Sequence, residues 1–173
     1  PADGHFSITF MNCYWADGCK ERMPRARNAE LHILNCYYYT NVSSSLAIGL
    51  GGGTKGTTCY VEGTNFDKVS NVYKSYNSSD GGTHSINFVD CLKGKSNVGT
   101  VSAPTYSYTA MDVSLVKNAV TNTNCGAGAT LLVTTSGAIS SSCSGSTPTV
   151  PTIALTSASA TANQTVESGS AIQ

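Results

Sequence analysis

The chain has 173 residues, and its ten basic and ten acidic side chains give a formal net charge of zero. Only 12% of the residues are charged, which excludes the basic surface of a general nucleic-acid-binding protein. Polar residues interrupt every apolar run before the roughly 20 residues that a membrane-spanning helix needs, so we expect no membrane span. One main domain fits this length, because domains usually contain about 100–200 residues.

Four segments in the first half of the chain mix β-branched and aromatic residues between Gly, Asn, Asp or Ser, which predicts short strands. They are Phe6–Trp15, Glu30–Tyr39, Thr57–Phe66 and Thr83–Cys91. The first three are similar to one another, and Cys13 and Cys36 hold equivalent places 23 positions apart. Such a repeat is typical of a β-solenoid, in which each coil stacks on the next and buries a shared core. We therefore predict an all-β fold.

The cysteines leave two interpretations open. Stacked coils lie about 4.8 Å apart, a distance that a disulfide can span. Cys13 and Cys36 either form such a bridge between coils or stack as two buried thiols. Seven cysteines without a Cys-x-x-Cys pair, with only three histidines, argue against a zinc finger or a redox motif.

The low charge and the abundance of Ser, Thr, Asn, Gly and Tyr are typical of secreted bacterial β-proteins, so we expect an extracellular or cell-surface location.

One helix is predicted near the end of the domain, over Asp112–Val120, because its first residue can act as the N-cap and its valines share one face. The composition then changes, since residues 118–173 contain one charged residue, Glu167. Two prolines mark a boundary in this region. We expect residues 1–145 to form the main domain. Residues 146–173 are expected to form a Ser/Thr/Pro-rich linker and the start of a module that resembles immunoglobulin-like repeats.

The densest group of charges is the run Lys20–Arg27, which lies between the first two predicted strand segments and holds four of the ten cations. Such a run is usually a solvated turn. Here Pro24 restricts its own backbone and that of Met23, which predicts a rigid extended piece. Arg25 and Arg27 then share one face, and guanidinium groups fixed on a β-surface suit carboxylates. We expect the ligand to be a polyanion that carries carboxylates along its length.

Several segments follow one another in the order found in a known family. They are Ile8–Trp15, Glu21–Arg27, Leu31–Tyr38, Tyr60–Phe66, Tyr106–Tyr108 with the helix after it, and Gly126–Gly128. Together they resemble the motifs of the pectate lyases of polysaccharide lyase family 1, over about residues 5–130. The resemblance implies a right-handed parallel β-helix with one short C-terminal helix.

The resemblance begins partway along the family's domain, so residues 1–145 are expected to be the C-terminal part of the β-helix. The first half would then lie in a second chain, have been lost by trimming or cleavage, or be absent from an unusually short relative. Calcium is the cofactor that the family implies. Its acidic ligands are expected upstream of this chain, so we assign no metal ligand here.

For function, the resemblance implies β-elimination on α-1,4-linked polygalacturonate, the reaction that degrades pectin. Arg22 aligns with the family's base, which removes the C5 proton, and Arg27 with the arginine that holds a substrate carboxylate by paired hydrogen bonds. Arg25 is expected to make a structural or peripheral contact, and with Lys20 it completes the predicted substrate-binding set. At the ordinary pKa of arginine, forming the neutral side chain near pH 9 costs about 4–5 kcal/mol. Alkaline conditions reduce this cost, and nearby calcium would lower the pKa of the arginine. Activity is therefore expected to rise with pH and with calcium.

Some features depart from the family, and alternatives stay open. The family's asparagine-ladder positions fall on Cys13, Cys36 and Thr64, which places less polar side chains inside. A pectin lyase would use an equivalent arginine on methylated substrate without calcium. A polygalacturonase-like hydrolase needs two facing carboxylates, whereas those of this chain are scattered. A non-catalytic β-helical carbohydrate-binding or adhesion module would bind uronates without cutting them. The histidines are predicted to be structural.

Overall fold

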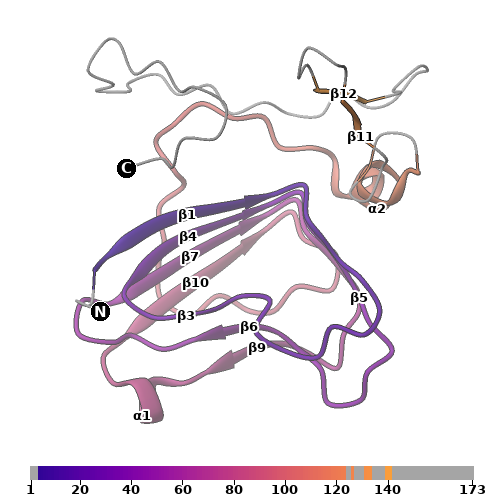
Figure 1. The fold of residues 1–173 in the computed structure, drawn as a ribbon. Coiled ribbons are helices and arrows are strands. Elements are labelled where there is room, and N and C mark those ends of the chain that lie inside the picture. The colour runs from indigo at the N-terminus through magenta and orange to yellow at the C-terminus, as the bar shows by residue number, and fades with distance from the viewer. Residues whose placement is uncertain (1–3, 124–125, 127–130, 134–138, 142–173) are drawn as a thin grey trace.

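The structure, a computed structural model, describes residues 4–123, 126, 131–133 and 139–141 (Figure 1). The chain winds into a β-solenoid whose successive coils stack their strands in three sheets. The first sheet contains β1 (Phe6–Met11), β4 (Ala29–Leu34), β7 (Thr57–Glu62) and β10 (His84–Val89). The second contains β2 (Tyr14–Trp15), β5 (Tyr37–Tyr39) and β8 (Asn65–Lys68), and the third β3 (Arg25–Ala26), β6 (Leu46–Leu50) and β9 (Asn71–Ser75). All neighbouring strands in these sheets run parallel, which confirms the predicted parallel β-helix.

The register of the sheets follows the sequence repeat. Tyr14 pairs with Tyr37, 23 positions later, and Tyr37 pairs with Asn65, 28 positions later. The equivalence of Cys13 and Cys36 is therefore confirmed. Strands β6 and β9, which complete the second and third coils, were not predicted, because neither belongs to the repeating segments.

A bend follows each strand of the first sheet and directs the chain into the next side of the solenoid. The residue at the bend has a positive φ in every coil: Asn12 (56°), Asn35 (52°), Gly63 (54°) and Asp90 (48°). These are the residue types that adopt the left-handed region most readily. The sequence therefore sets the corner of each coil with a single residue.

The residue after each bend is Cys13, Cys36, Thr64 or Cys91, and each side chain donates to the carbonyl two residues before it. Cys36 and Cys91 also reach a carbonyl of the preceding coil. The five cysteines in the described part of the chain are free thiols, so Cys13 and Cys36 stack without a bridge. A hydrogen bond with Cys36 lowers the pKa of Cys13 to about 7.

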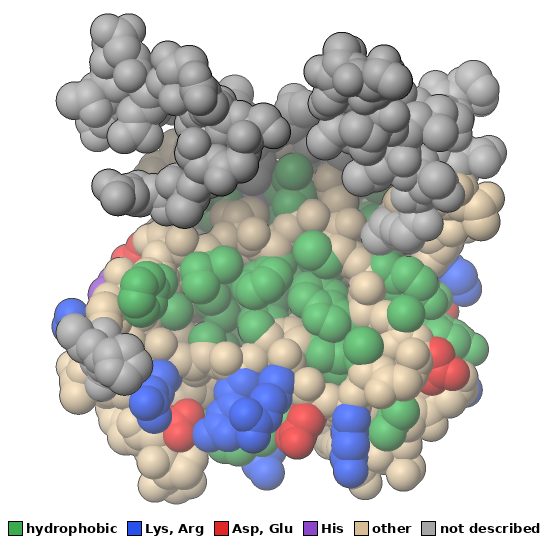
Figure 2. Space-filling model, viewed as in Figure 1, with side chains coloured by type: hydrophobic (Ala, Val, Ile, Leu, Met, Phe, Trp, Pro, Cys, Tyr) green, Lys and Arg blue, Asp and Glu red, His purple; other side chains and the backbone are tan. Residues whose placement is uncertain are grey.

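Aromatic rings stack along the interior. Trp15 lies 4.4 Å from Tyr38, and Tyr38 lies 4.8 Å from Phe66, measured between ring centroids. In the first coil the inward-facing Phe6 and Ile8 are 58% and 43% exposed. Figure 2 shows an extended apolar surface at this end of the solenoid.

The predicted helix is confirmed as α2 (Val113–Thr121), and the Asp112 side chain accepts a hydrogen bond from the Ser114 amide at 2.9 Å. Val116 and Val120 pack against Tyr37 of β5. A second helix, α1 (Asn77–Asp80), was not predicted.

Beyond α2, the strands β11 (Leu131–Val133) and β12 (Ile139–Ser141) pair antiparallel. The predicted linker and module at 146–173 lie outside the described residues. Among the described residues, no helix is long and apolar enough to cross a membrane.

Candidate functional site

The predicted site residues lie on the side of the solenoid formed by β3, β6 and β9. We call the group Lys20, Arg22, Arg25, Arg27 and Lys74 the basic surface. Figure 2 shows Lys and Arg side chains gathered on the side where Figure 1 places β3. Sequence reasoning identified four members of this group but missed Lys74, because β9 was not predicted.

The run Lys20–Arg27 bends before β3, with a positive φ at Arg22 and a turn at residues 23–24, so the prediction of a rigid extended piece was wrong for residues 21–24. The physical reason is the anchoring of Met23, which is only 3% exposed. Its amide donates to the Ala47 carbonyl at 2.9 Å, and its carbonyl accepts from the Tyr38 hydroxyl at 2.6 Å. Pro24 follows it through a cis peptide bond. The extended strand begins only at Arg25.

Arg22 directly precedes the buried Met23. Its φ of 68° lies in the left-handed region, which residues other than Gly, Asn and Asp rarely adopt. Backbone held in such a conformation by its surroundings is frequent at functional sites. The Arg22 side chain is exposed and is therefore accessible to a large ligand.

Arg25 and Arg27 alternate with Ala26, which packs against the core. Arg25 has partners within the protein: its Nη2 lies 2.9 and 3.2 Å from the two carboxylate oxygens of Asp80 in α1. Its guanidinium carbon also lies 4.0 Å from the centre of the Tyr76 ring. These contacts fix the Arg25 side chain within the protein, and its predicted part in substrate binding stays a prediction.

Two glycines of the middle coil create the space for these contacts. A Cβ atom at Gly49 would lie 2.8 Å from Tyr76 Cε2, and one at Gly51 would lie 2.5 Å from Asp80 Cβ. Both contacts are closer than real side chains allow. Tyr76 and Asp80 can therefore fold back over this face only because both positions lack a side chain. Outward-facing glycines next to a strand are the signal that could have revealed this packing.

The remaining predicted residues, Lys20, Arg22 and Arg27, are all exposed. No hydrogen bond or ion pair joins their charged groups to another residue in the described part of the chain. An arginine offers a planar fork of donors that matches a carboxylate. The surface therefore presents cationic groups that an anionic ligand can reach without displacing an internal partner.

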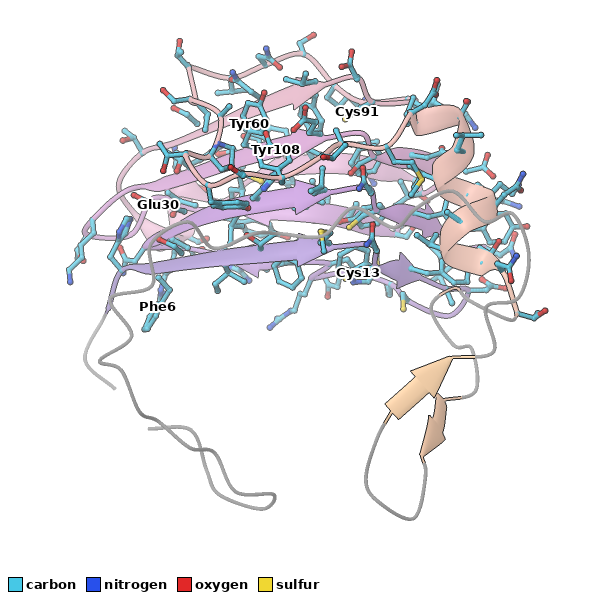
Figure 3. The ribbon with its side chains drawn as sticks, turned by 90° about the horizontal axis from the view of Figure 1, so that it is seen from above. Phe6, Cys13, Glu30, Tyr60, Cys91 and Tyr108 are labelled. Atoms are coloured by element: carbon cyan, nitrogen blue, oxygen red, sulfur yellow. The ribbon has the colours of Figure 1, made fainter. Side chains whose placement is uncertain are left out.

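A second polar region lies on the outer face of β1, β4 and β7, where residues 100–106 cross the sheet. A groove of about 570 Å³ between them is lined by Thr9, Glu30, His32, Tyr60 and Tyr106, among others. Figure 3 shows Tyr60 and Tyr108 close together on this face, with Glu30 nearer to Phe6.

His32 is the most deeply buried polar group of this groove, with 3% of its surface exposed. Its Nδ1 is hydrogen-bonded to the Tyr106 hydroxyl, which also lies 2.7 Å from Thr9 Oγ1. Its Nε2 lies 3.8 Å from Glu62 Oε2. Burial lowers the pKa of His32 to about 4, so the imidazole is neutral at pH 7. The contacts support the structural role predicted for this histidine.

Calcium is the cofactor that the family resemblance implies, with its acidic ligands expected upstream of this chain. In the portion that the structure describes, no three His, Cys, Asp or Glu side chains are grouped so that they could hold a metal ion. These residues therefore do not fit a calcium ion, and the mechanism proposed below contains no step through one.

One comparison with known proteins identifies the family of the chain. Searches of the curated proteins and of the solved structures found no significant match. A family model described as pectate lyase matches residues 2–130, a span that contains all the solenoid strands, the basic surface and α2. The chain belongs to the pectate lyase family.

Proposed function

We propose that this chain acts on polygalacturonate as a pectate lyase, with Arg22 as the base and Arg27 as the ligand of the substrate carboxylate. Membership of the family suggests lyase activity in general. The exposed Lys20, Arg22 and Arg27 support an anionic substrate, because no ion pair within the described residues occupies their charged groups. Cleavage of a polymer too large to enter a cell also supports an extracellular location.

The reaction needs one proton transfer and one bond cleavage. The neutral Arg22 guanidine takes the C5 proton, the C5–H electron pair forms a double bond between C4 and C5, and the bond from C4 to the glycosidic oxygen breaks. The departing oxygen takes a proton from solvent. Arg27 pairs with the carboxylate on C5 through two hydrogen bonds. By spreading negative charge away from C5, this contact makes the neighbouring proton easier to remove.

The observation that carries the assignment is the position of Arg22. Its backbone is held at a positive φ beside the buried Met23, and its exposed side chain makes no ion pair with any residue that the structure describes. Arg25 is held by Asp80 and its charge is compensated there, whereas Lys20 adds a further cation at the edge of the site.

The experiment measures the ultraviolet absorbance of unsaturated uronides formed from polygalacturonate at alkaline pH, with calcium and then with a chelator. The wild-type chain is expected to form product, and Arg22→Ala to lose at least roughly a hundredfold in rate, which is the lower range for a general base. Arg22→Lys should also be inactive, because it cannot reproduce the planar group. An Arg22→Ala variant with the full rate would overturn the assignment. Silence of the wild type with intact uronate binding would favour the non-catalytic binding module.

A further inference from the structure

We propose that Lys74 binds a second substrate carboxylate, at a subsite two coils from Arg25, and thereby selects uronate polymers with free carboxylates over methyl-esterified ones. This inference rests on the proposed function, because it extends the same basic surface. It assigns a specificity role to a residue outside the aligned arginine motif.

The register of the third sheet places Lys74 in line with the arginine motif. Arg25 of β3 pairs with Gly49 of β6, and Gly49 pairs with Lys74 of β9. Strands of neighbouring coils lie about 4.8 Å apart, so the backbones of β3 and β9 are separated by roughly twice this distance. Since Gly49 carries no side chain, the middle strand places nothing between the two cations, and the Tyr76 ring, from the residue after β9, lies over this position.

Lys74 is not neutralised by the protein. It is exposed, and its ammonium group makes no ion pair with another residue in the described ranges. The nearby carboxylate, Asp80, is bound to Arg25 through both of its oxygens. The pair of Arg25 and Asp80 is neutral overall, so Lys74 contributes an uncompensated positive charge to this end of the surface.

Tyr76 gives this subsite a shape as well as a charge. Its ring lies 4.0 Å from the Arg25 guanidinium carbon and 5.1 Å from Lys74 Nζ. Such cation–π contacts restrain both the ring and the cations around it. A half-buried tyrosine offers an apolar body and a polar tip, which suits the face of a sugar ring whose carboxylate reaches Lys74.

The chemistry of the polymer links this subsite to the arginines. A polyuronate carries one carboxylate on every ring, so a chain bound at Arg27 presents further carboxylates to more distant cations. A methyl ester removes the negative charge and with it the charge-assisted hydrogen bond to an ammonium group. Lys74 can therefore favour the acid form of the substrate.

The test uses the full chain and compares Lys74→Gln with Lys117→Gln. The second variant removes the same charge from α2, which lies far from β9 (Figure 1). Calorimetry would measure the Kd of hexagalacturonate and of its methyl ester for each variant, and kinetics would measure kcat and KM on polygalacturonate.

We expect Lys74→Gln to raise the Kd and KM for the acid form roughly fivefold, the scale of an exposed charge contact. Its kcat and its Kd for the methyl ester should stay unchanged, as should every value of Lys117→Gln. An unchanged Kd for hexagalacturonate, or equal weakening of both ligands, would overturn the inference. Binding without turnover by the wild type would refute the lyase activity alone, because the Kd values still test Lys74. A wild-type chain that neither bound nor cleaved the substrate would refute both the lyase activity and the role of Lys74.

Discussion

Two outer faces of the solenoid carry polar side chains, which are exposed on one face and buried on the other. On the basic surface, Arg22 and Arg27 are exposed and have no ion-pair partner in the described chain. On the outer face of β4, His32 is buried beneath the crossing segment and hydrogen-bonded to Tyr106. Burial keeps the imidazole neutral, whereas exposure keeps the guanidinium groups available. The comparison shows that the surroundings of a polar residue, and not its chemical type alone, decide whether its charged group is available to a ligand.

The largest expected effect on this contrast is the contribution of His32 to the pH dependence of the free energy of unfolding. Its pKa is about 4 in the folded chain and about 6.5 when unfolded, so the unfolded state binds more protons in between. Its contribution to the free energy of unfolding is complete above pH 6.5 and is lost as the pH falls towards 4. From this pKa difference we expect a loss of about 3 kcal/mol between pH 7 and pH 4.

Thermal and urea unfolding between pH 4 and 7 would measure this contribution. His32→Gln should show a shallower decline than the wild type. The matched control is His5→Gln, since His5 is exposed, and it should follow the wild-type curve. Identical slopes for His32→Gln and the wild type would break the contrast between the two faces.

On the basic surface, Arg27→Lys tests whether geometry matters in addition to charge. Lysine keeps the positive charge but loses the planar pair of donors. We expect kcat/KM on polygalacturonate to fall roughly tenfold, and Arg27→Gln, which also loses the charge, to fall further. Full activity of the lysine variant would show that Arg27 acts only as a point charge.

A smaller effect concerns Asp67, which connects α2 to the solenoid. Its carboxylate accepts from the Tyr37 hydroxyl at 2.8 Å and lies 3.2 Å from both Lys93 and Lys117. The hydrogen bond from Tyr37, followed by that from Lys117, lowers the pKa of Asp67 to about 2. The stabilisation is present above about pH 4, the unfolded pKa, and is lost as the pH falls towards 2.

For Asp67→Asn we expect about 1 kcal/mol less stability at pH 7, a modest value because solvent screens this partly exposed group. Chemical denaturation at pH 7 and pH 2.5 would measure the difference from the wild type. The gap in stability between Asp67→Asn and the wild type should narrow at pH 2.5. A gap that stayed constant would show that the substitution acts through packing and not through the ionised carboxylate.

The sequence predicted the solenoid because its coils repeat a visible pattern of strand, bend and small residue. It did not predict β6 and β9, since these strands lack that pattern and the step between coils changes from 23 to 28 residues. The motif identified Arg22 and Arg27, whose role depends on exposure. It could not reveal that Arg25 pairs with Asp80, 55 positions away.

The same limit applies to the buried face. The contact between His32 and Tyr106 joins residues 74 positions apart, and only the crossing of residues 100–106 over the sheet brings them together. Local pattern therefore predicts the elements and the exposed motif. Partners that come from different coils depend on how the coils stack, and a single sequence does not encode this in any nearby spacing.

The basic surface is proposed to support elimination and not hydrolysis. The most direct test of this proposal follows polygalacturonate cleavage by the wild-type chain with two readouts, ultraviolet absorbance of the unsaturated product and the number of new reducing ends. The account predicts that both rise together, one double bond for each bond broken. New reducing ends without the absorbance would contradict it and assign the chain to hydrolysis.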